Sequence, residues 1–115
     1  MSSVYITRQS PDGSGIPITL EEWNTYVASD ADLRVPDPAH PYFREGLVLL
    51  PTDGVSPDDW QWLLWGGGSI SSDYPQRPML KKIGQVARHF EAVVSNDDGD
   101  IWNIDENGRV TMADG

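Results

Sequence analysis

PITLEEWNTYVASDADLR, residues 17–34, opens with the signals that start an amphipathic helix. Thr19 is a suitable N-cap, and Glu22 follows three residues later, the spacing at which its carboxylate can reach back to the N–H of the cap residue. Ile18 and Trp23 stand at the two positions that form a hydrophobic staple across such a cap. The spacing therefore predicts that a helix begins directly after Thr19.

The apolar residues of this stretch continue with a helical period. Leu20, Trp23 and Val27 fall on one face, which predicts a helix that runs to about Ser29 and buries that face. Glu21 lies in the first turn, where the helix dipole favours a negative charge by roughly 0.3–1 kcal/mol. A catalytic carboxylate needs a partner group and a pocket, and the sequence indicates neither at this place.

Residues 59–65, DWQWLLW, alternate with the two-residue period of a β-strand. The alternation places two groups of side chains on opposite faces: Trp60, Trp62 and Leu64 against Gln61, Leu63 and Trp65. Because both groups are largely apolar, we expect this strand to be covered on both faces. Residues 66–72, GGGSISS, can turn back and pair with it as a hairpin.

Other segments also have strand character: residues 4–9, 44–50, 92–96, 100–104 and 109–112. The last three predict a meander, because Asn107 and Gly108 tolerate the positive φ that a tight hairpin requires. Three prolines within residues 35–42 exclude a helix or a central strand there and predict a loop.

A second amphipathic helix is predicted from about Tyr74 to His89, with Asp73 as its cap. Its apolar positions recur at helical spacing: Met79, Ile83, Val86 and Phe90, with Leu80 and Ala87 beside them. Its basic side chains are expected on or near the outer face: Lys81, Lys82, Arg88 and His89. Basic residues near the C-terminal end of a helix are favoured by its dipole.

These elements predict an α+β fold in which two helices pack on a single, mostly antiparallel sheet of five to seven strands. At 115 residues the chain has the length of one domain, residues 1–115, and is long enough to bury a core without disulfides.

The charge of the chain bears on its partners. Eighteen Asp and Glu against eight Lys and Arg give a net charge of −10, which disfavours binding to nucleic acid or to anionic lipid. The absence of cysteine excludes disulfides and thiolate metal sites and fits a reducing compartment. The first residues lack a signal-peptide pattern, and no run of about 18 apolar residues occurs. We therefore expect a cytoplasmic protein that does not enter a membrane.

Sequence motifs of catalysis are missing from the chain. The two histidines, His40 and His89, are far apart, no HExxH or GxSxG occurs, and the glycines at 66–68 are not followed by GK[ST]. The acidic turn at residues 97–100 could hold a hard cation, although the same residues are also typical of a tight turn. We expect no enzymatic activity, no cofactor and no metal.

Three segments together resemble a group of small bacterial proteins: ITLEEWNTYVASDADLR, WLLWGGGSISSD, and MLKKIGQVARHF leading into AVVSNDDGDIW. That group shows the pattern I-T-x-x-E-W-x-x-Y-V-x-S-D-x-x-L-R near its start and D-D-G-[DE] followed by an aromatic residue near its end. The resemblance covers residues 4–102, and the tail after Trp102 departs from it by adding a further strand. It implies an immunity protein of a bacterial toxin system, of the contact-dependent inhibition or Rhs type, and it supplies no catalytic residues.

The expected function is therefore the binding and neutralisation of a cognate, basic toxin, for example a nuclease, by covering its active or substrate-binding surface. Acidic clusters steer basic partners, and tryptophan is enriched among the residues that dominate interfaces. The expected contact residues are Glu21, Asp30, Asp32, Asp58, Asp59, Trp60, Trp65, Asp97, Asp98 and Asp100. Two alternatives remain: an acidic mimic of nucleic acid that inhibits its target, and an accessory protein that binds a small molecule in a pocket lined by the aromatic strand.

Overall fold

The structure is a computed structural model. The structure describes residues 3–10, 12–39, 43–56, 59–73, 75–96, 99–104 and 110–112. Its elements, in chain order, are β1 (Ser3–Arg8), α1 (Leu20–Ser29), β2 (Leu47–Leu50), β3 (Gln61–Gly66), β4 (Ser69–Asp73), α2 (Arg77–Phe90), β5 (Ala92–Asn96), β6 (Ile101–Ile104) and β7 (Val110–Met112). This is the α+β arrangement that the sequence predicts.

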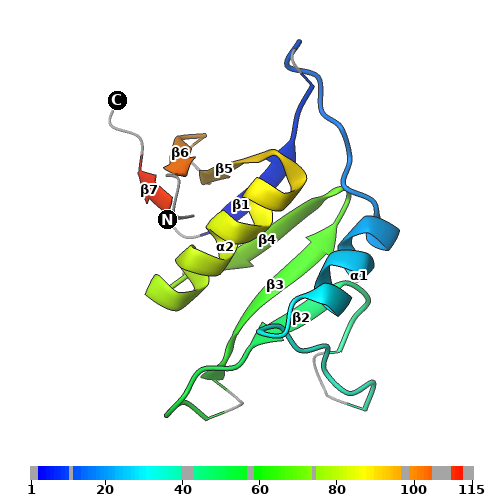
Figure 1. Cartoon of the computed structure of the whole chain (residues 1–115), viewed down its shortest axis with the longest axis vertical. Helices are drawn as coiled ribbons and strands as arrows, with labels where there is room; N and C mark the ends of the chain where they lie inside the picture. Colours follow the sequence, from blue (N-terminus) through cyan, green and yellow to red (C-terminus); the bar gives the residue numbers. More distant parts are fainter. Residues whose placement is uncertain are drawn as a thin grey trace.

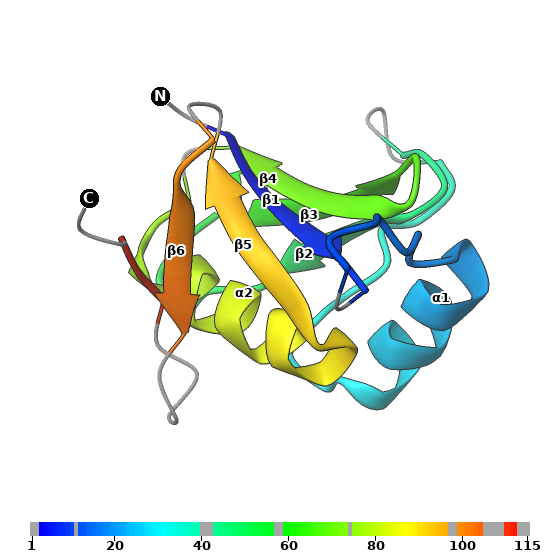
Figure 2. The same ribbon diagram turned by 90° about the horizontal axis from the view of Figure 1, so that it is seen from above.

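The strands form one sheet with the order β2-β3-β4-β1-β5-β6-β7, in which every neighbouring pair is antiparallel. Both helices lie on the same side of this sheet, α1 beside β2 and β3 and α2 across β1 and β5 (Figures 1 and 2). The sheet therefore has one face covered by helices and one face that neither helix covers.

Helix α1 begins and ends where its local signals predict. The backbone N–H of Glu22 donates to Thr19 Oγ1 at 3.0 Å, and the N–H of Thr19 donates to Glu22 Oε1 at 3.1 Å, which completes a capping box. Ile18 and Trp23, the two staple positions, are both fully buried. The helix ends at Ser29, and Asp30 is its C-cap.

Helix α2 begins later than the sequence indicated. It starts at Arg77, with Gln76 as an N-cap that makes no side-chain bond, and Asp73 is instead the last residue of β4, where its carboxylate accepts a hydrogen bond from the Ser3 hydroxyl. The observed start places Pro78 in the first turn of α2, where a proline is best tolerated because its missing N–H is not needed there. Tyr74 itself lies outside the described residues.

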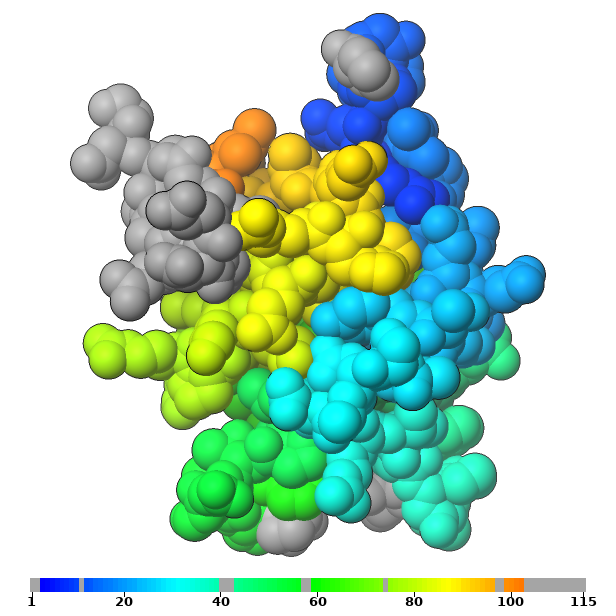
Figure 3. All heavy atoms as spheres, viewed as in Figure 1, coloured from blue at the N-terminus to red at the C-terminus, as the bar shows by residue number. Residues whose placement is uncertain are grey.

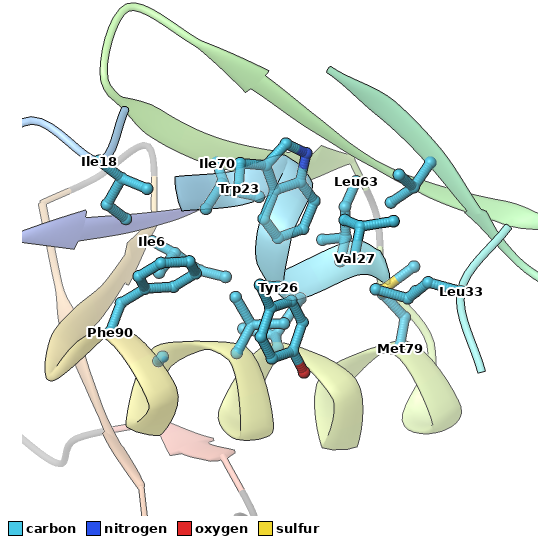
Figure 4. Close-up of a cluster of buried hydrophobic side chains, with 14 of the residues drawn as sticks. Ile6, Ile18, Trp23, Tyr26, Val27, Leu33, Leu63, Ile70, Met79 and Phe90 are labelled. Atoms are coloured by element: carbon cyan, nitrogen blue, oxygen red, sulfur yellow. The ribbon is translucent and has the colours of Figure 1, made fainter. Parts of the chain in front are cut away.

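The register of the strands decides which side chains enter the core. Ile6 of β1 pairs with Ile70 of β4 and Val94 of β5, and all three are buried on the covered face. In Figure 4, Trp23 of α1 lies against the sheet, near Ile70, while Tyr26 reaches toward α2. The apolar stripe of α2 fills the remaining space as predicted: Met79, Ile83, Val86, Ala87 and Phe90 are all buried. Side chains of the two helices close over the sheet on this side (Figure 3).

Strand β3 shows that the expectation of cover on both faces was wrong. Leu63 is fully buried on the covered face, whereas Trp62 and Leu64 point to the other face and stay partly exposed. The alternation predicted two apolar faces, but the two helices that the described residues form both pack on the same side of the sheet.

Candidate functional site

The expected contact residues fall into three groups in the structure. Asp58, Asp97 and Asp98 lie outside the described residues, so the acidic turn and its cation alternative are described only in part. Asp30 and Trp65 serve the fold. The others keep exposed or partly exposed side chains: Glu21, Asp32, Asp59, Trp60 and Asp100.

Asp30 is not an exposed surface carboxylate, which argues against its expected role as a contact residue. Its side chain is only 9% exposed, and it accepts hydrogen bonds from Lys82 Nζ at 2.9 and 3.1 Å and from the Tyr26 hydroxyl at 2.7 Å. Lys82 was expected on the outer face of α2 but has a side-chain exposure of 6%. Lys82 also donates to Asp32 Oδ2 at 2.9 Å, and this second carboxylate is 69% exposed. The four side chains fasten the end of α1 to the middle of α2.

The ionisation of this cluster follows from its contacts. Burial raises the pKa of the Asp30 carboxyl, but the hydrogen bonds from Lys82, from Tyr26 and from the N–H of Asp32 lower it more, so its pKa lies below the usual value. Burial, the hydrogen bond to Asp30 and its negative charge raise the pKa of Tyr26 above its usual range. Asp30 therefore remains an anion and Tyr26 remains a donor, as a structural ion pair requires.

A second ion pair joins β1 to the first turn of α1. The guanidinium of Arg8 donates to both oxygens of Glu22 at 2.9 and 2.8 Å, and it also donates to the carbonyl of Pro17 at 2.7 Å. The hydrogen bond from Arg8, with that from the Thr19 backbone, lowers the pKa of Glu22 to about 2. Glu22 thus helps to hold α1 against the sheet.

Most letters of the pattern E-W-x-x-Y-V-x-S-D-x-x-L-R have a role in folding. Trp23 is buried and its Nε1 donates to the Gly46 carbonyl at 2.9 Å, while Leu33 is buried in the same core. The backbone of Arg34 bridges to that of Leu49 in β2. Because these residues hold the fold, the pattern marks a way of folding more directly than it marks a contact surface.

A hollow of about 440 Å³ lies between the start of α1 and the end of α2. Its walls carry carboxylates, one guanidinium, hydroxyls and an imidazole: Arg8, Thr19, Glu21, Glu22, Thr25 and His89, with Phe90 and Glu91. Arg8 and Glu22 are already paired with each other there. The sequence did not point to this hollow, because its walls come from segments that are far apart in the chain. Its lining includes no residue of β3, so it is not the aromatic pocket of the small-molecule alternative.

The tryptophans of β3 and its approach are divided between the two faces. Trp65 faces the covered side, packs on the core and donates from Nε1 to the Ile18 carbonyl at 2.6 Å, so its side chain is held within the fold, which argues against its expected role as a contact anchor. Trp60 stays partly exposed and donates from Nε1 to the Val55 carbonyl at 3.1 Å. Trp62 is also partly exposed, on the face that no helix covers. Trp62 was not among the contact residues expected from the sequence, although the alternation placed it on the same face as Trp60.

The exposed carboxylates are not gathered into one cluster. Glu21 lies in the first turn of α1, and Asp32 lies just beyond the other end of this helix. Asp59 precedes β3, and Asp100 precedes β6. Among these, Asp59 lies next to the partly exposed aromatic residues in sequence.

Comparison of the chain with known protein families, with curated proteins and with solved structures gives no match. In the part of the chain that the structure describes, neither helix has both the length and the apolar character needed to cross a membrane. The same described residues contain no group of three or more His, Cys, Asp or Glu side chains placed to hold a metal ion.

Proposed function

We propose that this protein is a cytoplasmic immunity protein that binds a cognate bacterial toxin, one with a basic surface such as a nuclease, and blocks the active or substrate-binding surface of that toxin. The observation that supports this proposal best is the face of the sheet that neither helix covers, on which partly exposed Trp62 and Leu64 are available to a partner. Tryptophan on an accessible surface is typical of the centre of a protein interface.

The charge of the chain supports the same class of partner. A net charge of −10 accelerates association with a basic protein and disfavours competing polyanions. An interface of ordinary size would bury on the order of 1,200–2,000 Å², which one face of this sheet and its rim can supply.

The proposal is tested with the product of the gene that lies next to the one encoding this chain. We expect that product to arrest growth when it is expressed alone, to be harmless when it is expressed with this protein, and to purify as a complex with it. A product that is harmless by itself would contradict the proposal. A toxin mixed with this protein in vitro should lose its activity at a one-to-one ratio, which separates direct neutralisation from an effect on expression.

A further inference from the structure

The uncovered face of the sheet carries an apolar corner on β2 and β3. Leu47 is paired with Leu64, and Leu49 is paired with Trp62, so four large apolar side chains are adjacent on this face. The main core cluster contains Val48 and Leu50 of the same strand but not Leu47 or Leu49. The corner is therefore a second apolar surface on the other side of the sheet from the helices.

The cover of this corner is incomplete. Leu47 is buried, but Leu49, Trp62 and Leu64 all keep part of their surface exposed, and Trp60, two residues before Trp62, does so as well. On the same face the neighbouring strand β4 presents the small polar side chains of Ser69 and Ser71, since Leu64 pairs with Ser71. An apolar patch with a polar border is the usual anatomy of a contact surface.

Carboxylates flank one end of the corner. Asp59 is exposed and adjoins Trp60 in the sequence, and the exposed Asp73 ends β4, two residues after Ser71, the partner of Leu64. Arg34 pairs directly with Leu49 at the outer edge of β2, which places its exposed side chain on the same face beside Leu49. The Arg44 carbonyl accepts the N–H of Leu47. Asp59 and Asp73 thus form an acidic end of the corner, and Arg34 lies across the corner from them at the outer edge of β2.

We propose that this corner, defined by Leu49, Trp60, Trp62 and Leu64, is the surface that docks the partner, with Asp59 and Asp73 at its acidic end. This inference rests on the proposed function and specifies its chemistry. The partner presents an apolar side chain that packs on Trp62 and Leu64, and it places lysine or arginine side chains against Asp59 and Asp73. The helix side of the molecule, including Glu21 and Asp32, faces away from the partner.

The test measures the affinity of the purified toxin for five forms of the full chain: wild type, Trp62→Ala, Asp59→Lys, and the matched controls Ile16→Ala and Glu21→Lys. Ile16 is exposed beside the end of β1, and Glu21 is exposed on α1. We expect Trp62→Ala to weaken binding at least about 30-fold and Asp59→Lys to weaken it about 10-fold, mainly through slower association at low salt. We expect both controls to change affinity less than about threefold.

The outcomes separate the two proposals. If wild type neither binds nor neutralises the toxin, the proposed function fails and this inference fails with it. If wild type binds but Glu21→Lys weakens the complex while Trp62→Ala and Asp59→Lys do not, the corner is not the docking surface and the function stands. Thermal unfolding of each variant shows whether a loss of affinity comes from a loss of folded protein, and Trp62→Phe, which keeps an aromatic ring, should retain most of the binding.

Discussion

The two faces of the sheet are built from the same alternating strands, yet their side chains differ in solvent exposure. On the covered face, Ile6, Leu63 and Ile70 have no more than 1% of their surface exposed. On the other face, Trp62 and Leu64 are equally apolar by sequence but remain partly exposed. The difference comes from what lies opposite each face, because both helices pack on one side. Apolar alternation thus identifies surfaces that can be buried, and the rest of the fold decides which of them is buried within the chain.

The carboxylates divide in the same way. Asp30, on the covered side, is held by Lys82 and Tyr26. Asp59, at the edge of the uncovered face, is exposed. A buried carboxylate that is paired contributes to folding, whereas an exposed one is available to steer a partner.

The largest test of this contrast compares Trp23→Ala with Trp62→Ala. Trp23 is fully buried and donates to the Gly46 carbonyl, so its removal should lower the free energy of unfolding by roughly 3–5 kcal/mol. Trp62 is partly exposed, and the same change there should cost about 1 kcal/mol. Urea unfolding, followed by circular dichroism, measures both values. Equal losses would mean that the uncovered face is as much a part of the core as the covered one.

The second test removes the buried cation. Lys82→Met leaves Asp30 without its main counter-charge in a buried place, which should cost about 3 kcal/mol of unfolding free energy. Lys81→Met, the same substitution at an exposed neighbour on α2, should change it by less than about 0.5 kcal/mol. Restoring neutrality in the double variant Lys82→Met, Asp30→Asn should recover part of the loss.

The pH dependence of stability provides a second measurement on the same pair. The pKa of Asp30 is lowered in the folded protein, so its contribution is present above the unfolded pKa of about 3.9 and is lost as the pH falls through the folded value. Wild type should therefore lose stability more steeply below about pH 4 than the double variant does. Identical pH profiles would show that Asp30 has the same proton affinity in the folded and unfolded chains.

The sequence could predict features that depend on residues close together in the chain, but not those that depend on residues far apart. The cap of α1 depends on Thr19 and Glu22, three residues apart, and it was predicted correctly. The bonds of Lys82 join residues 50 and 52 positions apart, and no local pattern carries that information, so Lys82 was placed on the wrong face. Aspartate is a residue type that often caps helices, which is why Asp73 was predicted as the cap of α2. In the structure Asp73 instead ends β4, Pro75 follows it, and the helix begins later.

The candidate site shows the same limit. Alternation grouped Trp60 with Trp62 and separated both from Trp65, and the strand pairing confirms that Trp62 and Trp65 lie on opposite faces. It could not indicate which group the helices would cover, and Trp65 was therefore selected and Trp62 missed. That choice depends on the packing of α1 and α2 on one side, which is a property of the whole chain.

A smaller effect on the free energy of unfolding is expected at the β3–β4 hairpin, where the two adjacent glycines Gly67 and Gly68 differ in their surroundings. A Cβ on Gly68 would lie 2.8 Å from Pro17 Cβ at a φ of +93°, and the Gly68 carbonyl accepts the N–H of Ile18, which leads into α1. A Cβ on Gly67, at a φ of +61°, would meet nothing within 4 Å. Gly68→Ala should therefore cost about 2–3 kcal/mol and Gly67→Ala about 1 kcal/mol, as measured by thermal or urea unfolding. Equal costs would show that Pro17 can move away and that this contact does not position α1.

The smallest effect on stability is expected for the ion pair between Arg8 and Glu22, which lies at the margin of the covered face. Arg8 continues the inward series Val4 and Ile6 on β1, so its charge is brought against α1 and requires a counterion there. The pKa of Glu22 is lowered to about 2, so the stabilisation it provides is complete above its unfolded value of about 4.3 and disappears as the pH falls toward 2. Carboxyl carbon shifts recorded during an NMR titration should show Glu22 titrating near pH 2 in wild type and closer to its unfolded value in Arg8→Met. If Glu22 titrates near pH 4 in both proteins, the pair that it forms with Arg8 does not stabilise the fold.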